Sequence, residues 1–155
     1  MKAKRLLLPA LAAMLLAACD PGFTEEYIID NQSSHDLVFV WSGSWRYYPN
    51  ENGLNFDGSY PVAAGTKATL PFSGDLGQTG RDQIYASARY GLLGDSVSFV
   101  VGTDTLTFYA SDTLNADSPY NFNSPRYTYD ELPGPAGGMS YASLTFRVDD
   151  AMLER

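Results

Sequence analysis

Apolar and polar residues alternate along much of the chain after residue 26, and this period of two is typical of strands with one buried face. The clearest example runs from Tyr141 to Val148. A second run, Leu37–Trp41, is apolar at every position, which predicts a central strand buried on both sides. Weaker runs predict further strands at four places: 27–31, 66–72, 84–88 and 126–129. No helical periodicity is visible before the last few residues.

The segment from Val97 to Phe108 predicts a β-hairpin with a defined register. Gly102-Thr103 has the composition of a two-residue turn, because glycine supplies the positive φ that such turns need. This turn brings three pairs onto one face: Val101 with Asp104, Phe99 with Leu106, and Val97 with Phe108. The other face then carries Ser96 with Tyr109, Ser98 with Thr107, and Val100 with Thr105. A slip of one residue would mix the two faces, so the pattern specifies the register strongly.

These runs amount to seven or eight short strands separated by Gly, Pro, Asn and Asp. With 45% hydrophobic residues in 155, they predict one all-β domain: a single antiparallel β-sandwich, immunoglobulin-like in size, with a small β-barrel as the alternative. Three connections are too long to be tight turns, and long loops often carry binding sites. They span Gly43–Tyr60, Ala110–Pro125 and Asp130–Ser140.

The N-terminus has the organisation of an export signal. Lys2, Lys4 and Arg5 precede an apolar run from Leu6 to Ala18. A membrane-spanning helix needs about 20 apolar residues, so this run is too short to be a permanent anchor. Another feature of the chain must therefore hold the protein at a membrane.

That feature is Cys19, the only cysteine of the chain. The stretch Leu16-Ala17-Ala18-Cys19 resembles the lipobox of bacterial lipoproteins. The resemblance implies that residues 1–18 are a signal peptide and that Cys19 carries a diacylglyceryl group and a further acyl chain such as palmitate, which together anchor stably where one chain does not. We expect residues 19–26 to form the lipidated cysteine and a short tether, and residues 27–155 to form the β-sandwich domain.

Charge limits the partners of this domain. Cleavage before Cys19 leaves seven Lys and Arg against eighteen Asp and Glu, a formal charge of −11. Such a domain is repelled by anionic headgroups and by nucleic-acid phosphates, so nucleic acid is excluded and the acyl chains must make the membrane contact. We expect the outer membrane of a bacterial envelope. Asp20 resembles an inner-membrane retention signal in enteric bacteria, whereas acidic residues at this point resemble a surface-export signal in gut-type anaerobes. The sequence therefore does not decide whether the domain faces the periplasm or the cell surface.

Aromatic residues gather in two of the long connections, beside Asn, Arg and Asp side chains. Rings that stack and amides that bind hydroxyl groups are what a glycan or peptide site uses. The alternative is that these rings cover an open end of the sandwich. The candidate ligand-binding residues are Trp45, Tyr47, Tyr48, Phe56, Tyr60, Tyr120 and Phe122.

The sequence gives little support for catalysis. His35 is the only histidine, which excludes a Cys/His zinc site within one chain, and its surroundings predict a turn. Gly94-Asp95-Ser96-Val97 resembles the nucleophile block of lipase-like hydrolases, but no histidine follows Ser96 to act as its base. Residues 50–58 are rich in oxygen ligands but lack the spacing of a calcium loop. We expect no catalytic residue, no metal and no cofactor.

Three segments together resemble a group of small uncharacterised lipoproteins of gut-type Gram-negative anaerobes: Ile28–Asp36, Asp95–Phe99 and Leu144–Asp150. The resemblance implies a location in the cell envelope and supplies no activity. Three hypotheses follow. The first is a non-catalytic, lipid-anchored sandwich that binds a glycan, peptide or envelope partner. The second is a structural or accessory subunit of an envelope complex, which contacts its partner through a sheet edge or face. The third is a hydrolase that uses paired carboxylates.

Overall fold

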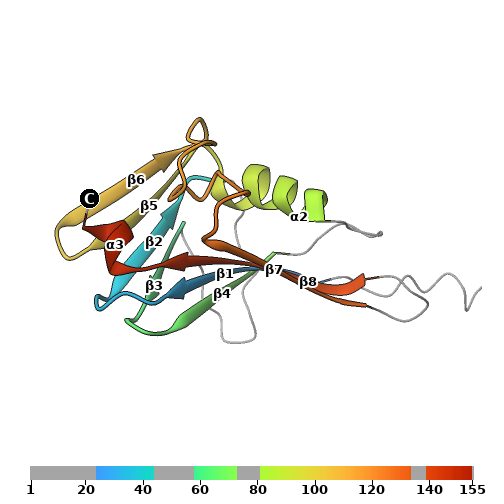
Figure 1. Ribbon diagram of the computed structural model, residues 1–155, viewed down its shortest axis with the longest axis horizontal. Helices are drawn as coiled ribbons and strands as arrows, with labels where there is room; N and C mark the ends of the chain where they lie inside the picture. The colour runs from blue at the N-terminus through green and yellow to red at the C-terminus, as the bar shows by residue number, and fades with distance from the viewer. Residues whose placement is uncertain (1–23, 44–57, 73–80, 134–138, 155) are drawn as a thin grey trace, which may run out of the picture.

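A computed structural model describes residues 24–43, 58–72, 81–133 and 139–154. Their strands form two four-stranded sheets that pack against each other, with a helical segment beside them (Figure 1). The first four strands are β1 (Thr24–Asn31), β2 (Leu37–Trp41), β3 (Ser59–Val62) and β4 (Lys67–Phe72). The last four are β5 (Ser96–Val101), β6 (Asp104–Tyr109), β7 (Tyr127–Pro133) and β8 (Met139–Val148). The helical elements are α2 (Arg81–Ser87), the π-helical η1 (Ala88–Leu93) and α3 (Asp150–Leu153).

The strand order defines two sheets. Sheet A has the order β4-β1-β8-β7, and sheet B has the order β3-β2-β5-β6. Every neighbouring pair is antiparallel except β1 and β8, which run parallel over eight residue pairs. The all-β sandwich predicted from the sequence is therefore confirmed. The alternative of a small barrel is wrong, because the strands divide into two separate sheets rather than one closed sheet.

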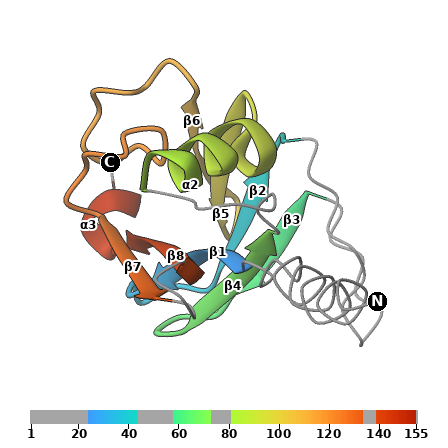
Figure 2. The same ribbon diagram turned by 90° about the vertical axis from the view of Figure 1, so that its right-hand side faces the viewer.

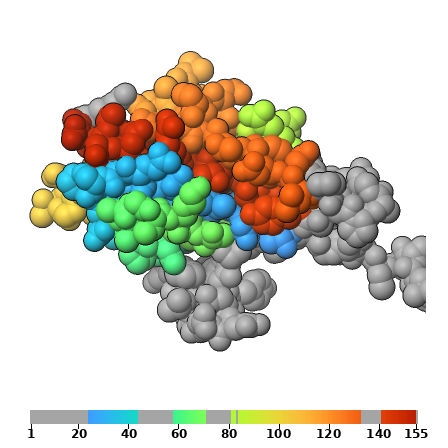
Figure 3. Space-filling view, turned by 60° about the horizontal axis from the view of Figure 1, so that its bottom comes forward, coloured from blue at the N-terminus to red at the C-terminus, as the bar shows by residue number. Residues whose placement is uncertain are grey.

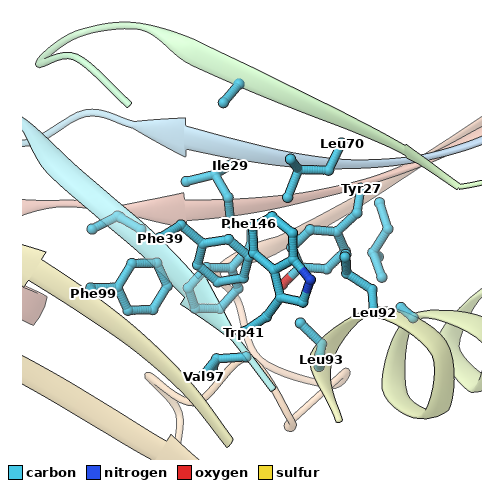
Figure 4. Close-up of a cluster of buried hydrophobic side chains, with 14 of the residues drawn as sticks. Tyr27, Ile29, Phe39, Trp41, Leu70, Leu92, Leu93, Val97, Phe99 and Phe146 are labelled. Carbon is cyan, nitrogen blue, oxygen red and sulfur yellow. The ribbon is translucent and has the colours of Figure 1, made fainter. Parts of the chain in front are cut away.

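Aromatic rings from both sheets fill the space between them (Figure 4). The ring of Phe39 in sheet B lies 6.2 Å from that of Tyr27 in sheet A and 5.4 Å from that of Phe99. The rings of Phe99 and Phe146 stack across the two sheets at 5.9 Å. All four side chains are at most 1% exposed. Large buried rings contribute most of the hydrophobic free energy of such a core, so this stack holds the two sheets together.

The predicted hairpin is confirmed residue by residue. Strands β5 and β6 pair with Val101 opposite Asp104, and the register continues without a shift to Ser96 opposite Tyr109. Gly102 in the turn has φ of 57°, the left-handed conformation that glycine adopts without strain. On the outer face, the hydroxyl groups of Ser98 and Thr107 lie 2.9 Å apart. The local pattern alone was sufficient to predict this register because the two faces of the hairpin differ from each other in polarity.

The strand predicted over 84–88 is wrong, because this segment forms α2 and the start of η1. Ile84, Ala88 and Leu92 are buried, whereas Ala86 is exposed. Burial thus follows the helical spacing of four rather than the spacing of two. The run Ile84-Tyr85-Ala86-Ser87-Ala88 satisfies both patterns, and the tertiary packing of one helical face decided between them.

Other boundaries also differ from the prediction. Strand β3 lies at the end of the predicted loop Gly43–Tyr60 and beyond it; Pro61 within this strand weakens its sequence signal. Strand β1 begins at Thr24, so the last three residues of the predicted tether belong to the sheet. Strand β7 continues past the predicted 126–129 to Pro133. The last few residues form a short helix, α3.

Residues 110–126 connect β6 of sheet B to β7 of sheet A through a series of turns (Figure 2). A buried ion pair holds this segment in place. The guanidinium of Arg126 places Nε 2.5 Å from Asp117 Oδ1 and Nη1 3.0 Å from Asp149 Oδ2. Hydrogen bonding from Arg126 lowers the pKa of Asp149 below its ordinary value. The ion pairs therefore link the segment to the residue that caps α3.

Candidate functional site

Three of the predicted ligand-binding residues lie among the described residues, and they do not form one surface. Tyr60 is a half-buried residue of β3 opposite Phe39, whereas Tyr120 and Phe122 belong to the segment that joins the two sheets. The remaining candidates lie outside the described residues: Trp45, Tyr47, Tyr48 and Phe56. The lipidation candidate Cys19 lies outside them too.

Tyr120 is part of the core. Its side chain is 1% exposed, and its hydroxyl donates a hydrogen bond to the carbonyl oxygen of Leu93 at 3.3 Å. Burial raises the pKa of the Tyr120 phenol well above its ordinary value. A ring in this position packs η1 against residues 110–126 and offers no open face to a ligand, so the geometry assigns Tyr120 a packing role.

Phe122 belongs to a cluster of four half-buried rings, here called the aromatic seam: Tyr85, Phe122, Tyr127 and Tyr129. The rings of Tyr85 and Phe122 are parallel, with their centroids 4.6 Å apart. Tyr129 meets Tyr85 edge-on at 6.5 Å, and Phe122 lies 5.4 Å from Tyr127. The seam lies where α2 meets β7, which are far apart in the sequence. One face of the Phe122 ring is thus used in packing against Tyr85.

Charged groups border the aromatic seam. The guanidinium carbon of Arg81 lies 5.2 Å from the centre of the Tyr85 ring, and its Nε donates to the Tyr85 hydroxyl at 2.5 Å. At the other side, the Tyr129 hydroxyl donates to Glu131 Oε2 at 2.8 Å, and burial together with this carboxylate raises the pKa of Tyr129 to about 12. The Tyr129 phenol therefore stays protonated at neutral pH and acts as a hydrogen-bond donor, not as a base, whereas the Tyr85 hydroxyl accepts from Arg81.

A second feature is a groove of about 310 Å³ between the β5–β6 hairpin and α3. Its apolar lining comes from inward-facing side chains of the hairpin and from the helix: Phe99, Val101, Leu106 and Leu153. Asp104, Thr105 and Glu154 supply its polar groups. The hairpin turn and α3 lie at the same end of the molecule (Figure 3). The groove combines an apolar floor with two carboxylates, which suits an apolar group that stands next to a cation.

The outer faces of the two sheets differ in charge. On sheet A, outward positions carry ionised groups, and the row that pairs β4, β1 and β8 brings together Lys67, Asp30 and Arg147. On sheet B, every described outward position of the four strands is uncharged. The outward residues of sheet B are Val38, Val40, Ser59, Pro61, Ser96, Ser98, Val100, Thr105, Thr107 and Tyr109. A partner that covers this face of sheet B would not have to desolvate a charged side chain there.

The residues considered for catalysis make structural hydrogen bonds through their backbone groups. His35 is exposed in the turn after β1, where its carbonyl oxygen accepts a hydrogen bond from Asn31 Nδ2 at 2.8 Å. Ser96 begins β5, and its N–H donates to Ser42 Oγ at 2.8 Å. Within the described ranges, no group of three or more His, Cys, Asp or Glu side chains is arranged to hold a metal ion. No helix among the described residues is long and apolar enough to cross a membrane.

Comparison with known proteins adds no family. No protein-family model, no curated protein and no solved structure matches this chain.

The groove was missed at the level of the sequence, although its signal was present. Phe99, Val101 and Leu106 were placed on one face of the hairpin, and the turn beyond them leaves that face without a further strand to cover it. The position of α3 against this face is a tertiary fact. The aromatic seam was missed because Tyr85 was assigned to a strand, on the face opposite Ile84, whereas the structure places it in α2 against Phe122.

Proposed function

We propose that this chain is a lipid-anchored lipoprotein of a bacterial envelope whose β-sandwich is a non-catalytic binding module. The observation that carries the proposal is the placement of Cys19, with its lipobox-like context, five residues before β1. So short a connection keeps the domain beside the membrane while the acidic surface is repelled from anionic headgroups. The acidic residues after Cys19, which resemble the surface-export signal of gut-type anaerobes, support the outer membrane as the site of anchoring.

The geometry supports a location of the binding surface at one end of the domain. Strand β1 has eight residues and rises about 25 Å from Thr24 to Asn31. The turn that follows Asn31 contacts α3, because the Ser34 N–H donates to Asp150 Oδ1 at 2.8 Å. The groove beside α3 therefore lies at the end of the domain opposite the start of β1 (Figure 1). In an anchored protein, this end faces away from the bilayer and is accessible to a partner.

The anchoring part of the proposal is tested by labelling. The full chain and its Cys19→Ser variant are expressed in a gut-type Gram-negative anaerobe with radioactive palmitate, and membranes are separated by density. We expect the wild-type chain to incorporate the label and to sediment with the outer membrane, whereas the variant incorporates none. Label in the Cys19→Ser chain, or an unlabelled wild-type chain, would overturn the assignment of Cys19. Protease treatment of intact cells then distinguishes the surface from the periplasmic side.

A second candidate function is a structural or accessory subunit of an envelope complex. The uncharged outer face of sheet B favours it, because a permanent partner can cover this face without desolvating an ion. Cross-linking in intact cells from Ser98→Cys, on the uncharged face, is compared with Thr145→Cys on the outer face of sheet A. A single discrete adduct from position 98 and none from position 145 would support the subunit role.

A further inference from the structure

Each sheet of the sandwich has two edge strands, and three of these four edges carry features that block the addition of another strand. Strand β3 has only four residues and contains Pro61. Strand β4 contains Lys67 and Pro71. Strand β7 carries two acidic residues and a register shift at Leu132/Pro133. Proline, lysine, short length and bulges are the devices by which natural proteins protect sheet edges.

Strand β6 has no proline, no lysine and no register shift over its described length, and its one acidic residue, Asp104, lies at the hairpin turn. Its six residues, Asp-Thr-Leu-Thr-Phe-Tyr, pair with β5 in a regular register, and no other described strand lies beside it. After the first position, every residue except Leu106 is β-branched or aromatic, which favours extended structure. An unprotected edge of this kind accepts a further strand readily.

The backbone direction along β6 identifies the groups that are available. The Ala110 N–H donates to the Asp95 carbonyl at 2.9 Å, so this pair is hydrogen-bonded across the hairpin. Because such pairs alternate, Thr105, Thr107 and Tyr109 direct their N–H and C=O groups away from β5. Asp112 already satisfies both groups of Tyr109, at 2.7 Å to its N–H and 2.8 Å to its C=O. Thr105 and Thr107 are left as the open part of the edge.

The groove lies along the inner side of this same edge. Leu106 and Asp104 both point to the inner side of β6 and both line the groove, two residues apart. Side chains of an added strand alternate in the same way, so a residue opposite Leu106 would enter the apolar lining while a residue two positions away would reach Asp104. Glu154 adds a second carboxylate at this end. The site thus suits a segment in which an apolar residue and a basic residue lie two positions apart.

We infer that β6 and its groove bind an extended protein segment by strand addition, and that the segment carries an apolar residue and a Lys or Arg two positions apart. The inference rests on the proposed binding role and gives it a partner class. A basic segment is favoured over a second copy of the chain, because the chain has a formal charge of −8 and pairing two β6 edges would bring Asp104 and Asp112 of both copies together.

The test uses the full chain in detergent micelles and a fluorescein-labelled peptide, Thr-Val-Thr-Lys-Thr-Val-Thr, with fluorescence anisotropy as the readout. The control peptide has Glu in place of Lys. We expect the Lys peptide to bind about tenfold more tightly or better, because Asp104 and Glu154 attract its ammonium group. Equal affinity of the two peptides, or no binding of the Lys peptide at about 1 mM, would overturn the inference.

Two variants at one position test the edge itself. Thr107→Pro removes the outward N–H and keeps the hydrogen bonds of β6 to β5, whereas Thr107→Val keeps the N–H and loses the same side-chain hydroxyl. We expect about a tenfold loss of affinity for the Lys peptide in Thr107→Pro and less than about a twofold change in Thr107→Val. Equal binding by both variants, with circular dichroism spectra like that of the wild type, would contradict strand addition.

If Thr107→Pro does not fold, the combination Asp104→Asn with Glu154→Gln keeps the inference testable, because it leaves the edge intact. This variant should lose the preference for the Lys peptide over the Glu peptide. Sedimentation addresses a second copy: a dimer of the wild-type chain that Thr107→Pro dissociates would overturn the basic segment as the occupant. Peptide binding is repeated with Cys19→Ser, so failure of anchoring and failure of the edge site are seen separately.

Discussion

Sheet A and sheet B each contribute four strands to one aromatic core, but they meet the solvent differently. Sheet A exposes carboxylates, a lysine and an arginine, and its two edges contain proline. The described outer face of sheet B is uncharged, and no other described strand pairs with the outer edge of β6. Charge and proline protect a sheet from association. The comparison teaches that sheet A carries charge and proline that keep it in water, and it is the reason for proposing sheet B as the side that meets a partner.

Inside the sandwich the two sheets should be equally sensitive to truncation. Phe146→Ala in sheet A and Phe99→Ala in sheet B each remove a ring from the same stacked pair. We expect each to lower the free energy of unfolding by about 3–5 kcal/mol, because the cavity is only partly refilled. Urea unfolding of the full chain measures this effect. Phe122→Ala, at the half-buried seam, serves as the control with a smaller loss. A loss below about 1 kcal/mol at either core position would mean that the sheets are held together elsewhere.

The link between sheet A and residues 110–126 depends on the buried ion pair. Arg126→Met leaves Asp117 buried without its guanidinium partner, and we expect a loss of about 3–5 kcal/mol in unfolding free energy. Arg147→Met is the matched control, since Arg147 is 45% exposed and lies 3.7 Å from the same Asp149 oxygen that Arg126 contacts. Removal of an exposed partner should cost less than about 1 kcal/mol. Equal losses in the two variants would show that the burial of Arg126 does not account for its contribution to the unfolding free energy.

Alkaline pH should act through the buried phenols of sheet A. The hydroxyl groups of Tyr27 and Tyr127 lie 2.8 Å apart, and burial raises the pKa of both above the ordinary value of 10.0. The folded protein therefore holds these protons more tightly than the unfolded chain does. Their contribution is fully present below pH 10 and is lost as the pH rises beyond it. The urea midpoint should fall between pH 9 and pH 11.

The double variant Tyr27→Phe, Tyr127→Phe tests the origin of this pH dependence. It removes both ionisable groups and keeps the rings that pack in the core. We expect its urea midpoint to fall less between pH 9 and pH 11 than that of the wild type. An unchanged pH dependence would assign the effect to other tyrosines, of which Tyr120 is the nearest alternative because its pKa is raised as well.

The smallest effect is expected at the exposed ion pair of sheet A. Lys67 Nζ lies 3.4 Å from Asp30 Oδ2, but the lysine side chain is 61% exposed. Lys67→Ala should change the unfolding free energy by less than about 0.5 kcal/mol, and the difference should shrink from about 0.1 M to about 1 M NaCl as screening increases. A larger, salt-independent change would mean that Lys67 stabilises its edge by packing.

The hairpin and the helix show how far the sequence determines this fold. From 97 to 108, the two faces differ in polarity and a glycine marks the turn, so one register satisfies every residue. Around Ile84, small residues satisfy both a helix and a strand, and only the burial of Ile84, Ala88 and Leu92 against the sandwich selects the helix. Pro61 concealed β3 because proline weakens the signal of a strand.

The candidate site was less predictable than the fold. The described aromatic candidates were chosen as ring-rich loop residues, but Tyr120 is buried and Phe122 packs on Tyr85, because exposed rings gain free energy by covering one another. The groove joins a hairpin to a helix about 50 residues later in the chain. Sequence patterns report which residues prefer burial, and they do not report which surfaces meet.

The sequence by itself determined the all-β class, the hairpin register and the strand over 141–148, because each depends on local alternation and turn chemistry, and it favoured a sandwich over a barrel, a choice that the two separate sheets of the structure decided. Its N-terminus also carries the whole basis for the proposed lipid anchoring. Only the tertiary structure decided the parallel pairing of β1 with β8, the helical state of 81–93 and the groove beside β6. These features depend on contacts between residues distant in the chain, whose free energy is gained only when the sheets have come together.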